Sequence, residues 1–281
     1  MTATAPPRRL WLCADDYGLS PGVNRAIRDL IGRGRLNATS IMVLAPACDR
    51  AEIGALQHVA AASERCAIGL HVTLTAPFRP LTLHMRPLTD DALPSLGRLL
   101  RLSLLRRLDA EIVRAEIAAQ IARFVELLGR VPDFVDGHQH VQLFPQIRDG
   151  FIAAVREAAP RAWVRQGGST RPWPELLGDP KALLLDLLSR GFRRRAARAG
   201  LATNSAFAGA YDFSIGTDFA ARAAGFLAAL PDGGLMMCHP GFVDDTLIGL
   251  DPVTTAREHE YAYFAGDDFP RLLAAQNVTL I

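Results

Sequence analysis

Four short apolar runs in this sequence end in acidic or histidine side chains. The runs end as Cys13-Ala14-Asp15-Asp16, Gly69-Leu70-His71, Asp136-Gly137-His138-Gln139-His140 and Met237-Cys238-His239-Pro240-Gly241. If the runs are strands of one parallel barrel, these polar residues meet at its carboxyl-terminal face, where barrels keep their active sites. Two histidines and one carboxylate from different strands form an N,N,O ligand set that leaves positions on a divalent ion open for water and substrate. The pattern therefore favours a metal-assisted hydrolytic site.

The paired aspartates suggest a division of roles. One carboxylate would supply the oxygen ligand, and its neighbour could act as the general base toward the attacking water. Each feature alone has a simpler interpretation, because single histidines are often structural and aspartates are common in turns after strands. Four of the seven histidines fall at the ends of these runs, and their convergence on one face favours the functional interpretation.

Two further side chains are candidates for substrate binding. His140 follows His138 by two residues; on a strand the two would share a face, and at a strand end His140 would line the substrate groove. Arg165 ends another apolar run and could keep Asp15 ionised by charge pairing. An ordinary structural arginine is an equally good interpretation of Arg165.

The elements that must position these residues alternate between short apolar runs and helical stretches. This alternation predicts a parallel sheet with crossover helices. About eight strands in one domain-sized chain favour a TIM-barrel-like α/β fold, which insertions could distort, over an open sheet. The predicted strands are residues 10–14, 39–44, 67–74, 134–137, 162–165, 201–205, 235–238 and 278–281.

Two helices are predicted from capping residues and periodicity. Ser20 followed by Pro21 is typical of a helix start, and the helix should run to about Ile31. Residues 109–128 repeat apolar side chains at helical spacing directly before the run that ends at His138. We expect residues 1–281 to form one domain, with insertions near residues 77–108 and 167–200 that depart from the alternation.

Composition excludes several classes of protein. Thirty-one basic residues against 29 acidic ones give a net charge of +2, which predicts no nucleic-acid partner. The four cysteines show no Cys-x-x-Cys spacing and are interpreted as reduced, buried residues. The apolar run after Arg9 is too short for a signal-peptide core, and no run reaches the roughly 18 residues of a membrane span. The sequence thus predicts a cytoplasmic protein.

The motifs resemble those of a known enzyme family. The run Ala14-Asp15-Asp16-Tyr17-Gly18-Leu19-Ser20 with Gly22-Val23-Asn24, and the later Gly69-Leu70-His71-Val72-Thr73-Leu74, Asp136-Gly137-His138-Gln139-His140 and His239-Pro240-Gly241, resemble the YdjC/ChbG-type (ChbG/HpnK) carbohydrate deacetylases. The matches follow the family's order from near residue 10 to near residue 260. Arg257 and Glu258 also resemble a late family motif, but a helix-surface ion pair is the simpler interpretation, and we assign them no chemistry.

The resemblance implies a fold, a reaction and roles for single residues. The family has a TIM-barrel-like fold and removes acetyl groups from N-acetylated amino sugars such as chitooligosaccharides. On the matching positions it implies that Asp16, His71 and His138 hold one divalent metal ion, that Asp15 is the general base and that His239 is the general acid. We expect Mg²⁺ or Zn²⁺, and Ni²⁺ or Co²⁺ would also suit this ligand set.

Other interpretations stay open at this stage. The same site could serve another metal-dependent hydrolase, a phosphoesterase or an amidohydrolase, or the chain could bind sugar or metal without catalysis. Residues 96–108 and 183–198 combine leucines with arginines, as helices at a membrane surface do. A glycolipid substrate, such as the hopanoid-linked sugars of some relatives, and a peripheral membrane contact would fit this pattern. Packing of the leucines on the barrel, with the arginines facing solvent, is the simpler explanation, although the sequence does not decide between the two. The sequence predicts no oligomeric state.

Overall fold

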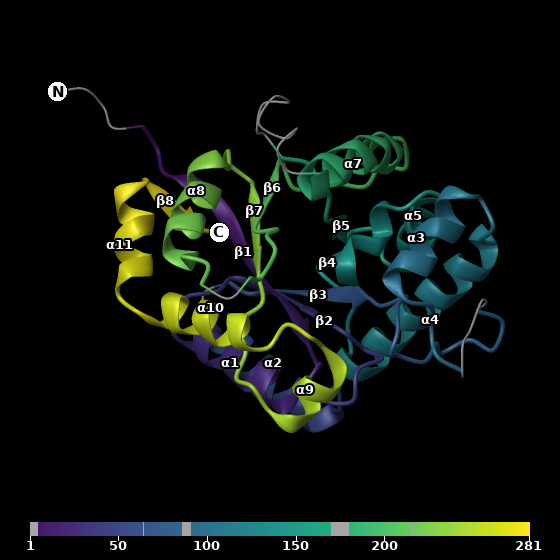
Figure 1. The fold of residues 1–281 in the computed structure, drawn as a ribbon, viewed down its shortest axis with the longest axis horizontal. Coiled ribbons are helices and arrows are strands. Elements are labelled where there is room, and N and C mark those ends of the chain that lie inside the picture. Colours follow the sequence, from purple (N-terminus) through teal and green to yellow (C-terminus); the bar gives the residue numbers. More distant parts are fainter. Residues whose placement is uncertain (1–4, 64, 86–90, 170–179, 215) are drawn as a thin grey trace.

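The structure is a computed structural model, and it describes residues 5–63, 65–85, 91–169, 180–214 and 216–281. Strands occupy the centre of the molecule and helices lie around them (Figure 1). Helices α3, α4 and α5 lie together on one side of the strands, and α8, α10 and α11 lie on the other (Figure 1). This arrangement confirms the predicted TIM-barrel-like α/β fold.

All strand pairs are parallel. The sheet has the order β5-β4-β3-β2-β1-β7-β6, and β8 pairs with the start of β1. The strands are β1 Arg8–Tyr17, β2 Ala38–Ile41, β3 Ala67–Val72, β4 Phe134–Gly137, β5 Trp163–Val164, β6 Phe207–Ala208, β7 Leu235–Cys238 and β8 Val278–Leu280. Because neighbouring strands run in the same direction, β1, β3, β4 and β7 deliver their final residues to one face.

The predicted strand at residues 201–205 is wrong. In the structure this segment makes one isolated bridge, between Thr203 and Val164, and β6 begins only at Phe207. The side chain of Asn204 accepts a 2.9 Å hydrogen bond from the amide of Gln166 and donates a 2.8 Å bond to the carbonyl of Ala206. These side-chain bonds replace the regular ladder that a strand would make. The single bridge links β5, at one edge of the sheet, to the segment that precedes β6, and the sheet itself is curled like half a barrel.

The helices begin where capping residues predict. The hydroxyl of Ser20 accepts a hydrogen bond from the amide of Val23, and Pro21 is the first residue of α1. Asp109 caps α4 in the same way. The helices are α1 Pro21–Gly32, α2 Arg50–Ala62, α3 Leu96–Leu104, α4 Ala110–Leu128, α5 Ile147–Ala158, α7 Pro180–Arg198, α8 Phe219–Ala229, α9 Asp245–Leu250, α10 Thr255–Ala265 and α11 Asp268–Ala275, with a 3₁₀ segment η1 at His138–Leu143.

The two predicted insertions contain helices. Helix α3 belongs to the first and α7 to the second, while residues 86–90 and 170–179 of these insertions lie outside the described residues. The four cysteines are free thiols, and three of them, Cys13, Cys48 and Cys238, are buried. In the described part of the chain, none of the helices is both long enough and apolar enough to span a membrane.

Candidate metal and catalytic site

A bulge near the end of β1 brings two neighbouring carboxylates into one pocket. The pairing of β1 with β2 shifts register between Ala14 and Tyr17, and Asp16 has a left-handed φ of 69°. In a regular strand, successive side chains point to opposite faces, and a bulge re-aims them. Asp15 and Asp16 are thereby both buried and both line the same pocket. Left-handed backbone at a residue other than glycine is uncommon and typical of functional sites.

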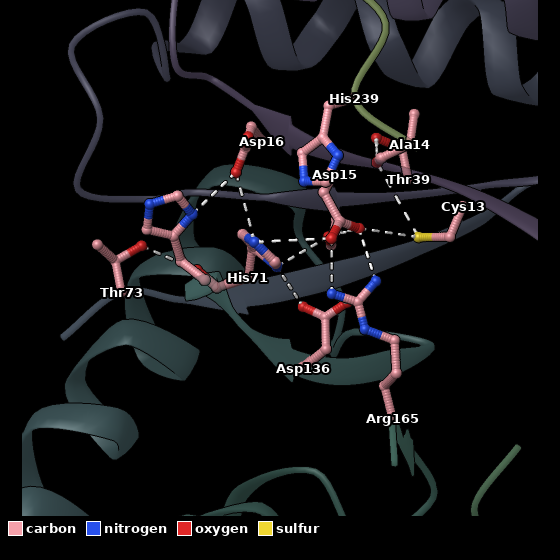
Figure 2. Close-up of polar contacts among 12 residues, drawn as sticks. Cys13, Ala14, Asp15, Asp16, Thr39, His71, Thr73, Asp136, Arg165 and His239 are labelled. Atoms are coloured by element: carbon pink, nitrogen blue, oxygen red, sulfur yellow. Dashed lines mark hydrogen bonds and ion pairs between the residues drawn. The ribbon is translucent and has the colours of Figure 1, made fainter. Parts of the chain in front are cut away.

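His71, on β3, lies among three carboxylates (Figure 2). Its Nδ1 is 2.6 Å from Oδ1 of Asp136, the residue beside it in the β3–β4 register. Its Nε2 is 3.4 Å from Oδ1 of Asp16. If Nδ1 donates its proton to Asp136, the lone pair of Nε2 faces the pocket. A carboxylate that fixes the tautomer of a histidine in this way is typical of histidine metal ligands.

His138 completes a set of three ligand atoms. It follows β4 directly, and its Nδ1 is 3.0 Å from the same Oδ1 of Asp16. Ligand atoms of Asp16, His71 and His138 all lie within 4.8 Å of one another. Two ligands that are each about 2.1 Å from one ion are separated by roughly 3.0 Å at a right angle and roughly 3.4 Å at a tetrahedral angle. The observed separations therefore fit one divalent ion.

Arg165 contacts Asp15 with two parallel hydrogen bonds. Its Nη1 and Nη2 each donate to an oxygen of Asp15 at 2.7 Å, and Nη2 is also 3.1 Å from Oδ2 of Asp136. Burial alone raises the pKa of Asp15, but Arg165 and His71 hold it below its ordinary value. This contact is the charge pairing that the sequence suggested. A direct role of Arg165 in substrate binding stays a prediction.

The expectation for Arg257 was wrong. Instead of pairing with Glu258 on a helix surface, Arg257 is buried, and its Nη2 donates 2.7 Å hydrogen bonds to Asp16 and Asp251. The reason is the orientation of α10, whose buried residues Arg257, Glu260 and Phe264 form one stripe. Burial raises the pKa of Asp16, but Arg257 and His138 outweigh this effect and hold it well below its ordinary value.

His239 follows β7 and is half-buried. Its ring lies edge-on to Phe213 with centroids 5.1 Å apart, and its Nδ1 has no hydrogen-bond partner among the described residues. Burial lowers the pKa of His239 to about 4, even though Asp16 and Asp15 attract the imidazolium. The imidazole is therefore neutral at neutral pH.

A buried carboxylate fixes the backbone of His239. Glu260 accepts a 2.5 Å hydrogen bond from the amide of His239 and a 2.7 Å bond from the hydroxyl of Tyr211. Burial raises the pKa of Glu260 to about 7. Glu260, Arg257 and Asp136 were not among the functional residues expected from the sequence. Their signal was present for α10, because charged residues spaced three apart share the face of the helix that also carries the apolar Phe264.

His140 does not lie on a strand, so the alternative in which it shares a strand face with His138 does not apply. Gln139 and His140 both have left-handed φ angles, 55° and 60°, within η1. The ring of His140 packs edge-on against Phe207, with centroids 5.3 Å apart. His140 does line the pocket, as the second alternative for this residue expected, and its contact with substrate stays a prediction.

The pocket around these residues has a volume of about 270 Å³. Its walls come from the ends of four strands and from the segment around α9 and α10. The lining residues are Asp15, Asp16, His71, Leu96, Gly137, His138, Gln139, His140, Phe213, Met237, His239, Asp251, Pro252, Val253 and Arg257. A pocket of this kind combines one polar, ligand-bearing wall with apolar walls, as small-molecule sites do.

Comparison with known proteins places this chain in a family. The model of the YdjC-like protein family matches residues 9–275, so the chain belongs to that family. Among solved structures, a proposed cellobiose-phosphate cleavage protein from Enterococcus faecalis is similar, with 18% identity, a TM-score of 0.75 and coverage of 98% of this chain and 97% of the other. The lactam utilization protein from Thermus thermophilus has 16% identity, a TM-score of 0.53 and coverage of 98% and 99%. At these identities the two structures support the fold alone.

Proposed function

We propose that this protein is a metal-dependent carbohydrate N-deacetylase that removes the acetyl group from an N-acetylated amino sugar, either chitooligosaccharide-like or linked to a lipid. The observation that carries the proposal is the convergence of Asp16, His71 and His138 beside a second, independently held carboxylate, Asp15. Membership of the YdjC-like family supports it, because the sequence motifs that define the resemblance are the same residues that meet in the pocket.

The chain offers three ligands to one divalent ion, Mg²⁺ or Zn²⁺ in the first instance and Ni²⁺ or Co²⁺ as alternatives. When bound, such an ion polarises an acyl oxygen and lowers the pKa of water beside it. Asp136 holds the ring of His71 through Nδ1, and Arg257 holds the second oxygen of Asp16. These contacts leave Nε2 of His71 and Oδ1 of Asp16 directed into the pocket.

Proton transfer would fall to Asp15 and His239. Asp15 is ionised, so it can accept the proton that the attacking water releases. The departing amine needs a proton, because an amine anion is a very poor leaving group. His239 starts neutral, so it must gain a proton during the reaction before it can donate one. The proton that Asp15 accepts from the attacking water would therefore pass to His239, and His239 would donate it to the nitrogen of the departing amine.

Two competing functions make different predictions. A phosphoesterase or amidohydrolase on the same ligand set would release phosphate or open a cyclic amide, and it would leave acetylated sugars intact. A protein that only binds sugar or metal through Asp16, His71 and His138 would not require Asp15, whose oxygens bond Arg165 and which is not one of these three ligands. Asp15→Asn therefore separates catalysis from binding. It should retain the metal and lose about 10²- to 10⁴-fold in turnover.

The direct test is mass spectrometry of the metal-loaded protein incubated with N-acetylated oligosaccharides, acetylated glycolipids and phosphate esters in separate reactions. Loss of one acetyl group from a sugar, abolished by Asp15→Asn, would support the proposal. Phosphate release without deacetylation would replace it with the phosphoesterase function. Metal binding that is unaccompanied by turnover of any substrate, in wild type and variant alike, would support the binding protein.

A further inference from the structure

Positive charge is concentrated in two segments of this chain. Residues 95–108 contain four arginines and no acidic residue, and residues 180–198 contain six basic residues and one aspartate. These two segments thus carry nine net positive charges, while the whole chain carries +2. The rest of the protein therefore carries seven net negative charges. The charge of this chain is therefore unevenly distributed along the sequence, although its net charge is close to zero.

Helix α7 presents leucines and arginines on one outward stripe. Leu184 and Leu187 are 41% and 46% exposed, and Arg190, Arg194 and Arg198 continue the exposed positions at intervals of three or four residues. Such intervals place residues on one face of a helix. The outward face of α7 is therefore apolar in its first half and cationic in its second half.

The end of α3 repeats this combination. Leu104 and Leu105 are 56% and 52% exposed, and the exposed Arg106 and Arg107 follow directly. The hydroxyl of Ser103 donates a hydrogen bond to the carbonyl of Pro145, next to α5. Helices that lie at a lipid surface carry such pairs of exposed leucines beside arginines.

Helix α5 connects the two segments into one surface. Arg148 of α5 lies so close to Gly191 of α7 that a Cβ there would be 2.6 Å from its Nη1. Burial lowers the pKa of Arg148, and repulsion from Arg195, Arg106 and Arg194 adds to this effect, while Asp149, which pairs with Arg195 at 2.7 Å, opposes it. In the described ranges, no carboxylate lies within ion-pair distance of the guanidinium groups of Arg148, Arg106 and Arg194. We call the exposed leucines and arginines of residues 98–107 and 184–198, with Arg148, the α3–α7 surface.

We propose that the α3–α7 surface docks on an anionic lipid membrane, with its leucines in the interface and its arginines on the lipid phosphates. Charge complementarity and the paired leucines both favour this partner, because binding of a polyanion such as nucleic acid needs the arginines but not the leucines. Leu96, the first residue of α3, lines the candidate active-site pocket. Docking would thus hold the pocket beside the membrane. This inference does not rest on the proposed reaction.

The test is co-sedimentation of the full-length protein with vesicles of phosphatidylcholine alone, or of phosphatidylcholine with one-third phosphatidylglycerol. The protein should bind the anionic vesicles, and binding should weaken as salt is added. Arg106→Gln, Arg194→Gln and Arg198→Gln combined should weaken partitioning on the order of 100-fold. The matched control combines Arg9→Gln, Arg50→Gln and Arg271→Gln, which remove the same charge from exposed positions elsewhere and should have a much smaller effect.

Two further variants test the apolar contribution to binding and its independence from the metal site. Leu104→Ser with Leu187→Ser should weaken binding at high salt, where the apolar contribution persists. His71→Ala should sediment like the wild type, so that failure of the metal site and failure of the docking surface are distinguishable. Equal losses in the surface and control variants, equal binding to neutral vesicles, or binding to duplex DNA with no binding to vesicles would each overturn the proposal.

Discussion

Arg257 donates a 2.7 Å hydrogen bond to Oδ2 of Asp16, the carboxylate whose other oxygen faces both site histidines. Both residues are 1% exposed. The same nitrogen of Arg257 also donates to Asp251, so one guanidinium links α10 and the segment after α9 to the end of β1. A side chain that binds the oxygen of a ligand carboxylate that faces away from the metal fixes the orientation of that carboxylate and modifies its charge.

The first prediction concerns this contact. Arg257→Lys keeps a positive charge but loses the Nε–H group that donates a 2.9 Å hydrogen bond to the carbonyl of Val253 and so orients the guanidinium. We therefore expect the dissociation constant of the metal to rise about 10- to 100-fold. Isothermal titration with Zn²⁺ measures it. Glu258→Gln, an exposed neighbour on α10, is the control and should keep the wild-type affinity. Unchanged affinity in Arg257→Lys would remove the role we give to this residue.

The ligand histidines lead to a second prediction. His71→Ala and His138→Ala should each abolish stoichiometric metal binding while the barrel stays folded, because both side chains lie at strand ends. An ion that binds only the folded state raises the melting temperature, so added metal should stabilise the wild type and not these variants. His58→Ala and His259→Ala alter exposed histidines and should respond like the wild type. Full metal occupancy in either ligand variant would contradict the assignment.

The proposed proton donor gives a third prediction. His239→Ala should reduce hydrolysis of an N-acetyl sugar by about 10²- to 10⁴-fold, yet it should affect an aryl acetate ester much less, because a phenolate leaves without a proton. Steady-state turnover of both substrates at one pH is the measurement. An equal loss on amide and ester would indicate that His239 contacts the metal or the acyl oxygen instead.

Glu260 gives a prediction about stability and pH. Its pKa in the folded protein is raised from 4.5 to about 7 by burial, so the folded state favours the protonated acid. This contribution to stability is complete below the unfolded pKa and is lost as the pH rises through about 7. Glu260→Gln cannot ionise. The free energy of unfolding of the wild type relative to this variant should therefore fall by about 3 kcal/mol between about pH 4.5 and pH 7.

Urea unfolding of the metal-free proteins across this pH range tests the Glu260 prediction. His239 titrates in both proteins and largely cancels in the difference. Tyr211→Phe removes the other hydrogen bond to Glu260 but leaves its carboxyl group, so the pH dependence should persist in that variant. A difference between wild type and Glu260→Gln that does not change with pH would show that the carboxyl ionises freely.

The sequence predicted the parts of the site that local patterns encode. Asp15, Asp16, His71 and His138 directly follow apolar runs, and parallel strands must bring such ends together, so their convergence follows from topology. The pairing of Arg165 with Asp15 was one of two alternatives that the sequence left open, and the structure shows this contact. The features of the site that the sequence did not predict depend on side-chain contacts between distant segments. Helix α10 buries Arg257 against β1, and burial lowers the pKa of His239; neither effect is visible in the spacing of residues.

The segment at residues 201–205 illustrates a different limit. It begins with two apolar residues and the β-branched Thr203, but Asn204 bonds neighbouring backbone groups, and the segment makes one bridge. The side chain of Asn204 competes with the hydrogen bonds of a strand ladder. The outcome depends on the position of Gln166, which lies 38 residues away in sequence. The concentration of arginines in residues 95–108 and 180–198 is visible in the sequence, but that both segments meet on one surface emerges only when α3, α5 and α7 are seen together.

The central claim is that one ion, held by Asp16, His71 and His138, is required for removal of an acetyl group. The most direct measurement is the rate of acetate release from an N-acetylated oligosaccharide while Zn²⁺ or Mg²⁺ is titrated into metal-free protein. The account predicts no release without metal, a rate that rises until one ion is bound per chain, and no release from His71→Ala at any metal concentration used. Acetate release by the metal-free protein at the wild-type rate would contradict it.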